Sequence, residues 1–364
     1  MPRPARSALL SWTALVPVLG IGALVLTWGR GLGLALVILV GLLLAGAVLA
    51  AVHHAEVVAH RIGEPFGSLV LAVAVTVIEV GLIVTLMASG GPDTAALARD
   101  TVFAAVMITL NGIAGLSLLL GAVRYGITLF NAEGSGAALA TVATLATLSL
   151  VLPTFTTSRP GPEFSPAQLA FAGISSLVLY TAFVLTQTVR HRDFFLPVYE
   201  DDAIGDEHAR PPTARAALVS VALLVVALVA VVGLAKVESP AIEATVEAAG
   251  LPQSFVGVVI AALVLLPETI AAVRAALRRR LQISLNLAYG SAIASIGLTI
   301  PAIALASVWL DGSLVLGLGP IQIVLFALTV LVSVLTVVPG RATRLQGIVH
   351  LVLLAAFLFL AVNP

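Results

Sequence analysis

The sequence predicts an all-α polytopic membrane protein with about 11 transmembrane helices, arranged as one N-terminal helix followed by two inverted five-helix repeats. Composition is the first indication, because 60% of the 364 residues are hydrophobic, 10% are charged and the mean hydropathy is +1.14. No water-soluble core of this size needs so many apolar residues. The apolar residues also fall into runs of bilayer length, and their odd number divides into one extra helix and two equal halves.

The predicted spans follow one another along the whole chain. The first comes after the basic segment Met1–Arg6, as in a signal peptide, but it lacks a clear small-residue cleavage site and is interpreted as a retained helix. A window of about 20 residues, the length that crosses a bilayer, separates the spans. They are Ala8–Trp28, Gly31–Val52, Phe66–Ala88, Thr101–Gly121, Gly136–Phe155, Ala167–Val189, Ala214–Ala235, Pro252–Val273, Gln282–Trp309, Leu314–Val337 and Leu345–Ala361.

The distribution of basic residues supports this count, because Lys and Arg favour cytoplasmic loops. With a cytoplasmic N-terminus, the outer segments hold only Arg30, Arg99, Arg159 and Lys236, and the other 14 of the 18 basic residues are cytoplasmic. The C-terminus is then outside. The net charge of zero offers no surface for nucleic acid, and the absence of cysteine excludes disulfides and thiolate metal sites.

Four segments are expected along the chain. Residues 1–30 form the extra helix, 31–189 the first repeat, 190–213 a cytoplasmic linker and 214–364 the second repeat. The linker is acidic and lacks the ligand spacing of an EF-hand loop, so both a cation-gathering role and simple solvation stay open. Its acidic residues are Glu200, Asp201, Asp202, Asp206 and Glu207.

Two glutamates, Glu79 and Glu268, lie near the middle of predicted spans, whereas every other acidic residue is expected between spans. A carboxylate at membrane depth costs at least about 2.5 kcal/mol on insertion scales, and such residues usually mark ion pathways or proton relays. An alignment of the halves that pairs these two glutamates also pairs Phe66 with Phe255, without a gap. Inverted repeats of this kind predict one shared site at the midplane.

The residues near these glutamates suit a hard cation. Ca²⁺ takes 6 to 8 oxygen ligands, of which two bidentate carboxylates supply about four. The remainder is expected from main-chain carbonyls and from Asn111, Ser291 and Thr76. Asn111 and Ser291 occupy equivalent places in the two halves, and Thr76 precedes Glu79 by three residues and so shares its helical face.

Pro267 predicts a break in the helix just before Glu268, because proline has no N–H to donate within a helix. Broken helices at membrane depth are tolerated where they line a cavity or an ion site. The paired carboxylates can also bind protons, since repulsion and desolvation disfavour two buried charges without a cation. Cation and proton then compete for one site, and alternating exposure of that site is sufficient for an antiporter.

A second group of polar residues lies near the cytoplasmic end of the second span. His53, Glu56 and His60 are three and four residues apart and share one helical face, away from which His54 points. This face can bind a metal, sense pH or simply be solvated. Together with Glu64, the residues Glu56 and His60 form a candidate cytoplasmic vestibule.

Two stretches carry a resemblance to a known family. They are GEPFGSLVLAVAVTVIEVGLIVTLM, from Gly63 to Met87, and LLPETIAAVRAALRRRLQISLNLAYGSAIASIGLTIPA, from Leu265 to Ala302. They resemble the two repeat motifs of bacterial ChaA-like calcium/proton antiporters, in the cation/proton exchanger branch of the calcium/cation antiporter superfamily. The resemblance covers nearly the whole chain and the plan of eleven spans.

This resemblance implies a bacterial inner-membrane protein that exports Ca²⁺ in exchange for H⁺, with Na⁺ and K⁺ as further ions in some members. It implies no resident cofactor, and inorganic cations, protons and the lipid bilayer as the partners. It also implies that Glu79 and Glu268 coordinate the cation and exchange protons, and that Asn111 and Ser291 support them.

The main alternative is an antiporter of the same build that carries mainly Na⁺ or K⁺, because selectivity depends on cavity size and ligand number. A cation channel or an intramembrane hydrolase is more remote. The sequence has no H-E-x-x-H pair and no evident serine with a nearby base, so no enzyme is expected. Proton stoichiometry, oligomeric state and the resting conformation stay open.

Overall fold

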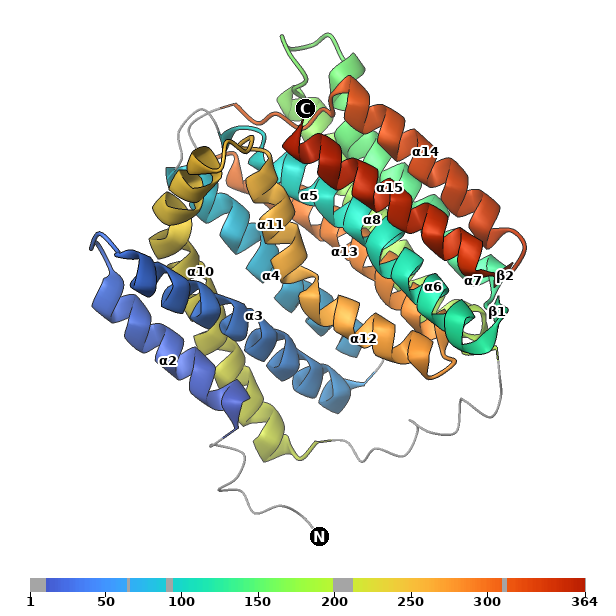
Figure 1. Ribbon diagram of the computed structural model, residues 1–364, viewed down its shortest axis with the longest axis horizontal. Helices are drawn as coiled ribbons and strands as arrows, with labels where there is room; N and C mark the ends of the chain where they lie inside the picture. Colours follow the sequence, from blue (N-terminus) through green and yellow to red (C-terminus); the bar gives the residue numbers. More distant parts are fainter. Residues whose placement is uncertain (1–10, 64–65, 90–93, 199–211, 310–312, 364) are drawn as a thin grey trace. The chain divides into compact units, whose positions relative to one another are not determined.

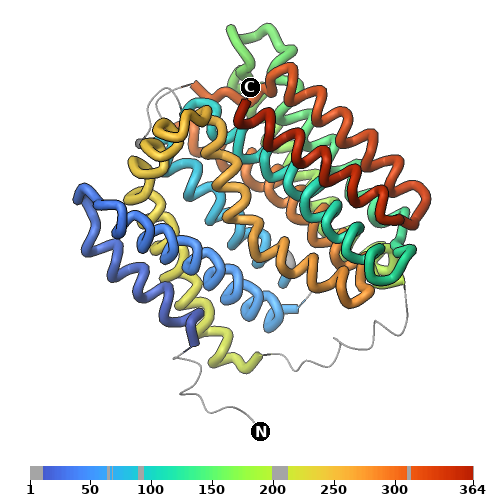
Figure 2. Tube along the Cα trace, in the orientation of Figure 1, coloured from blue at the N-terminus to red at the C-terminus, as the bar shows by residue number. Residues whose placement is uncertain are grey.

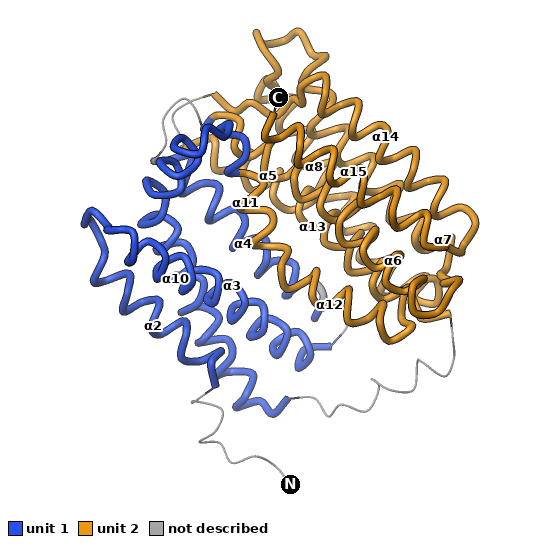
Figure 3. Tube along the Cα trace, in the orientation of Figure 1, with its two compact units in different colours: residues 1–94, 210–256 blue, residues 95–209, 257–364 orange. Residues whose placement is uncertain are grey.

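The computed structural model describes residues 11–63, 66–89, 94–198, 212–309 and 313–363. These residues divide into two compact units: unit 1 from residues 1–94 and 210–256, and unit 2 from residues 95–209 and 257–364 (Figure 3). Nine described helices are long and apolar enough to cross a membrane, one bent helix pair meets the same criterion when its two helices are taken together, and one shorter apolar helix precedes them. Each of the eleven predicted spans therefore corresponds to a helical segment.

The described residues of unit 1 form four helices, α2, α3, α4 and α10 (Figure 1). Helix α3 packs against each of the other three, and α10 does the same. Glycine permits two close approaches: a Cβ at Gly233 of α10 would collide with Leu24 of α2, and a Cβ at Gly81 of α4 would lie 2.6 Å from Val232. Small residues bring membrane helices together in this way. The bounds are α2 (Trp12–Thr27), α3 (Leu34–Ile62), α4 (Phe66–Ser89) and α10 (Ala214–Ala248).

Two helices of unit 1 extend well beyond the predicted spans. Helix α3 continues past Val52 to Ile62, and α10 continues past Ala235 to Ala248, with Pro240 inside it. The charged residues Lys236 and Glu238 predict an end to the seventh span, but charge alone does not end a helix whose backbone bonds stay intact. Glu238 is consequently inside a helix and only 4% exposed.

His54 joins three helices of unit 1. Its Nε2 lies 3.0 Å from the carbonyl oxygen of Thr13 in α2, and its Nδ1 lies 3.3 Å from Oγ of Ser220 in α10. Because a carbonyl oxygen only accepts, Nε2 carries the proton and the Ser220 hydroxyl donates to Nδ1. His54 is buried and His53 is exposed, so the prediction that His54 points away from the His53 face is confirmed.

We expect His54→Ala to destabilise unit 1, because the substitution leaves a cavity and removes both polar contacts, each worth about 1 kcal/mol. The thermal unfolding midpoint of the purified protein in detergent measures this effect. His53→Ala is the matched control, since His53 is the exposed neighbour in the same helix. Equal midpoints for the two variants would contradict the role given to His54.

Unit 2 begins with helices from the first half of the chain. The predicted span Thr101–Gly121 is a helix from Leu97 to Tyr125 that contains a π-helical stretch, η2. The next span ends with a second π-helical stretch, η3, followed by a 3₁₀ helix, η4. The elements are α5 (Leu97–Met107), η2 (Ile108–Ile113), α6 (Ala114–Tyr125), β1 (Thr128–Leu129), α7 (Ala132–Ala146), η3 (Thr147–Val151), η4 (Leu152–Phe155), α8 (Pro166–Leu185), η5 (Thr186–Arg190) and η6 (Arg192–Phe195).

Helices from the second half complete unit 2. The predicted span Pro252–Val273 is two helices, α11 and α12, which meet at a bend of 54° that Figure 2 shows along the chain trace. The predicted span Leu314–Val337 begins later, because the helix starts with Pro320. The elements are α11 (Phe255–Val264), α12 (Leu266–Leu277), α13 (Leu281–Ala306), α14 (Pro320–Val337), β2 (Arg341–Ala342) and α15 (Arg344–Val362).

The packing within unit 2 follows the relation expected of repeats. Helix α6, from the fourth span, packs on α15, from the eleventh, and α13, from the ninth, packs on α8, from the sixth. In the repeats, the fourth span is equivalent to the ninth and the sixth to the eleventh. Each of these two helix pairs is therefore the counterpart of the other. Loops of the two halves also pair: β1 is antiparallel to β2, and Glu163 forms a β-bridge with Val315.

Candidate cation site

Glu79 lies within α4, an apolar helix of 24 residues without a break. Its side chain is 3% exposed, and Thr76, one turn earlier, is 8% exposed. The close contact of Gly81 with Val232 fixes how α4 packs on α10 near this carboxylate. A buried carboxylate on an uninterrupted helix of bilayer length is the strongest single indication of an ion pathway in this chain.

Glu268 occupies a different backbone environment, because it lies in the first turn of α12, directly after the bend. Pro267 also lies in that first turn, where a missing N–H costs nothing. The N-terminus of a helix carries partial positive charge, which stabilises the carboxylate form of an acidic side chain. The Glu268 side chain is half-buried.

Asn111 and Ser291 lie on elements that pack against α12. Asn111 is fully buried in the π-helical stretch η2, and Ser291 is half-buried in α13. Helix α12 packs against both η2 and α13. Unit 2 therefore brings together the elements that carry Glu268, Asn111 and Ser291, whereas Glu79 and Thr76 share α4 in unit 1.

The Asn111 carboxamide is engaged on both sides. Its Nδ2 donates to Thr329 Oγ1 in α14 at 3.0 Å, and its Oδ1 lies 3.0 Å from His350 Nδ1 in α15. A carboxamide oxygen has two lone pairs, so one remains for a further contact. Sequence analysis missed Thr329 and His350, because their contact with Asn111 spans more than 200 residues of chain.

Two further acidic residues that the sequence predicts between spans are buried within described helices. Glu238 is 4% exposed in α10, and Asp100 is 7% exposed in α5, where Arg99 Nε donates to its Oδ1 at 2.8 Å. Both lie near the ends of predicted spans, in helices that are longer than expected. A hydropathy window places such boundary residues in loops, because a few charges lower the local average.

The candidate vestibule is described only in part. His53, Glu56 and His60 are exposed on the last turns of α3. Among the described residues no group of three His, Asp or Glu side chains could hold a metal ion. Glu64 and the acidic run from Glu200 to Glu207 lie outside the described residues.

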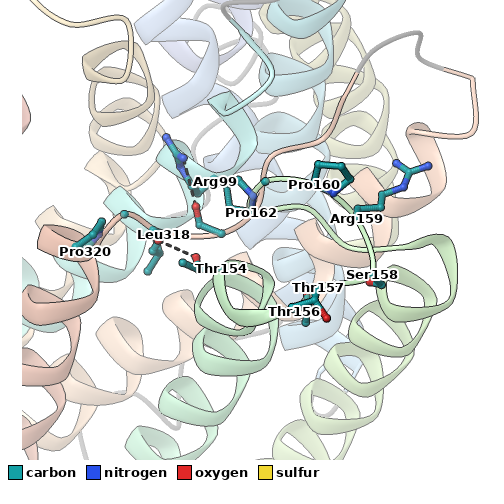
Figure 4. A pocket seen from close by; sticks show the side chains of 13 residues that line it. Arg99, Thr154, Thr156, Thr157, Ser158, Arg159, Pro160, Pro162, Leu318 and Pro320 are labelled. Carbon is teal, nitrogen blue, oxygen red and sulfur yellow. Dashed lines mark hydrogen bonds between the residues drawn. The ribbon is translucent and has the colours of Figure 1, made fainter.

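A pocket of about 730 Å³ opens between two loops of unit 2 (Figure 4). Arg99, Thr154 and Arg159 line it, and none of the predicted site residues does. The Thr154 hydroxyl joins the two loops by donating to the Leu318 carbonyl at 2.8 Å, and Arg99 of α5 donates to the Gly317 carbonyl at 3.3 Å. This pocket is separate from the carboxylates.

Known proteins resemble the whole chain. A putative ionic transporter, y4hA, of Sinorhizobium fredii is 47% identical over 100% of this chain and 98% of its own length. The sodium-potassium/proton antiporter ChaA of Escherichia coli is 35% identical over 94% of this chain and 93% of its own length. The structure of native YfkE has the same fold, with a TM-score of 0.71 at 16% identity, over 97% of this chain and 99% of that chain.

The family profile described as sodium/calcium exchanger protein matches residues 32–189 and 219–363. These two stretches contain both glutamates and all or most of every predicted span after the first. The family match agrees with the fold, which has two helical halves with a carboxylate helix in each. It also agrees with the nearly full-length similarity to an antiporter. The chain therefore belongs to the sodium/calcium exchanger protein family.

Proposed function

We propose that this protein is a secondary active antiporter that exports cytoplasmic Ca²⁺ across a bacterial inner membrane in exchange for protons, by alternating access. The observation that carries the proposal is Glu79, 3% exposed on an unbroken apolar helix. Ionisable groups at this depth mark ion pathways. A carboxylate can hold a cation and a proton in turn, which is the exchange reaction, and no covalent step is needed.

Glu268 is the second carboxylate of the proposed cycle. It occupies the position equivalent to Glu79 in the second half, and the bend before it frees backbone carbonyls that hard cations accept as ligands. Thr76, Asn111 and Ser291 are proposed to support the carboxylates, directly or through water. The repeats are proposed to extend over residues 31–189 and 214–364, which contain both glutamates.

The proposed direction is efflux, with the N-terminus in the cytoplasm and the C-terminus outside. The distribution of the 18 basic residues supports this orientation. Moving two positive charges outward against a potential of about 100 mV costs about 4.6 kcal/mol. Two incoming protons cancel this electrical cost, so the proton concentration gradient can drive Ca²⁺ out. Basic residues such as Arg278 and Arg280 are proposed to contact anionic lipid at the cytoplasmic surface.

A second candidate is exchange of Na⁺ or K⁺ for protons through the same carboxylates. Similarity to the sodium-potassium/proton antiporter ChaA favours it, at 35% identity over nearly the full length. Against it, YfkE, which shares the fold, is described as a Ca²⁺/H⁺ antiporter. Two carboxylates also balance one divalent ion more closely than one monovalent ion.

Everted membrane vesicles with an imposed acid interior test the proposal. Ca²⁺ at roughly micromolar concentration is expected to release protons, whereas vesicles without the protein stay acid. If only Na⁺ or K⁺, at millimolar concentration, released protons, the second candidate function would replace Ca²⁺/H⁺ exchange. If none of Ca²⁺, Na⁺, K⁺ and Mg²⁺ released protons, antiport itself would be contradicted.

A further inference from the structure

Three elements of unit 2 share a buried polar cluster that contains neither of the two glutamates. It joins Asn111 of η2, Thr329 and Thr336 of α14, and His350 of α15, all of which are at most 3% exposed. In addition to the two contacts of Asn111 described above, His350 Nε2 lies 3.2 Å from Thr336 Oγ1. Each polar atom of the His350 ring and of the Asn111 carboxamide thus has a partner on another element.

With the Asn111 oxygen facing His350 and its nitrogen facing Thr329, the donors and acceptors of this cluster are consistent. Asn111 Oδ1 can only accept, so His350 Nδ1 carries the proton and donates it. A neutral imidazole then has its lone pair at Nε2, which accepts the Thr336 hydroxyl proton. A reversed carboxamide would need His350 Nδ1 to accept and the Thr329 hydroxyl to donate, so the tautomer of His350 and the orientation of the Asn111 carboxamide depend on each other.

Two glycines allow His350 to come this close. A Cβ at Gly115 of α6 would lie 2.7 Å from the Cβ of His350, and a Cβ at Gly347 of α15 would lie 2.5 Å from the backbone nitrogen of Leu119. Small residues at such a crossing let two membrane helices approach until their backbones nearly touch. The Cβ of His350 thereby lies beside Gly115, one turn after Asn111 along the α5–η2–α6 helix, and its ring contacts the Asn111 carboxamide.

Asn111, at one end of the cluster, lies on an element that packs against the helix of Glu268. Asn111 lies in the π-helical stretch η2, and single π-helical turns within α-helices occur frequently at functional sites. Helix α12, whose first turn contains Glu268, packs on both η2 and α6. The orientation of the Asn111 carboxamide is therefore set beside the helix of a proposed cation ligand.

We propose that His350 is a positioning residue for exchange. Its Nδ1–H holds the Asn111 carboxamide in one orientation, so that the remaining lone pair of Oδ1 supports the cation site, while Thr336 holds the ring. This inference rests on the proposed function. A histidine that merely joined helices would affect stability and leave the affinity for the cation unchanged, which separates the two roles experimentally.

A double-mutant cycle on the full-length protein tests the inference. His350→Ala is expected to raise the Ca²⁺ concentration for half-maximal proton release about tenfold, with a smaller effect on the maximal rate. Asn111→Ala is expected to raise it at least as much. In the double variant the increase should stay within about twofold of Asn111→Ala alone, because His350 acts through Asn111.

Rescue by similar side chains adds a second readout. In His350→Asn the amide nitrogen can occupy the place of Nδ1, so the Ca²⁺ concentration for half-maximal proton release should return toward the wild-type value. His350→Gln places its amide nearer the position of Nε2 and should not restore that value. Ser333→Ala is the control. Ser333 is fully buried on α14 between Thr329 and Thr336, and within the described residues its Oγ has no hydrogen-bond partner.

Some results would overturn the inference. Additive effects in the cycle, unchanged half-saturation in His350→Ala or Asn111→Ala, or equal rescue by Asn and Gln would each reduce His350 to a helix contact. Ca²⁺-dependent thermal stabilisation of the same purified variants measures binding without proton flux. If wild type binds Ca²⁺ but releases no protons, antiport fails while the binding cycle still decides the role of His350.

Discussion

Glu79→Gln is expected to abolish cation-driven proton release from vesicles, and Glu268→Gln is expected to do the same. Glutamine keeps the size of the side chain but has neither the charge that binds a cation nor a proton to exchange. For Glu79, 3% exposed on an uninterrupted helix, the loss should exceed a hundredfold, because the cation would lose a charged oxygen ligand in a region of low dielectric constant.

Two controls separate burial from position. Glu133→Gln, at the exposed start of α7, should leave proton release unchanged. Glu238→Gln removes a carboxylate that is as buried as Glu79 but lies outside the paired repeat positions. We expect this variant to retain exchange. Activity in Glu79→Gln, or its loss in Glu238→Gln alone, would assign the exchange to a different carboxylate.

Gly347→Ala is expected to prevent unit 2 from folding, so that little monodisperse protein is recovered in detergent. The added Cβ would lie 2.5 Å from the Leu119 backbone nitrogen and 2.8 Å from the Gly115 carbonyl oxygen. These are backbone atoms, which no rotamer change can move away. Overpacking in a close-packed core costs typically 1 to 3 kcal/mol or more, and here α6 and α15 would have to separate.

Gly136→Ala is the matched control, because it is also a helix-interior glycine of unit 2. Its added Cβ would meet only Val337 Cγ1, at 3.9 Å, which is an ordinary contact. Alanine favours a helix over glycine by roughly 1 kcal/mol, so this variant should be at least as stable as wild type. Normal recovery and midpoint for Gly347→Ala would contradict the packing of α6 on α15.

Much of the fold could be predicted because hydropathy is a local property. Each span is long enough to be recognised from about 20 consecutive residues without knowledge of its neighbours. Span ends were less predictable. Helix α10 continues through Lys236, Glu238 and Pro240 to Ala248, since charged residues near a membrane surface are tolerated and a helix bends at proline more readily than it ends.

Part of the candidate site could also be predicted. Carboxylates at membrane depth are rare and costly, so Glu79 and Glu268 stand out against 60% hydrophobic residues. Pro267 pointed to the interruption before Glu268, although the helices separate at Leu265, because proline fits the first turn of the following helix better than its interior. The ligand roles of Thr76, Asn111 and Ser291 stay predictions.

The sequence by itself determined the membrane class, the number of spans and the two carboxylate helices, because length, hydropathy and charge act within one segment. Only the tertiary structure decided which polar side chains meet. His350 and Asn111 are 239 residues apart, and His54 and Ser220 are 166 apart. Such contacts depend on how helices rotate and cross, and a few glycines set these crossings through steric contact with distant segments.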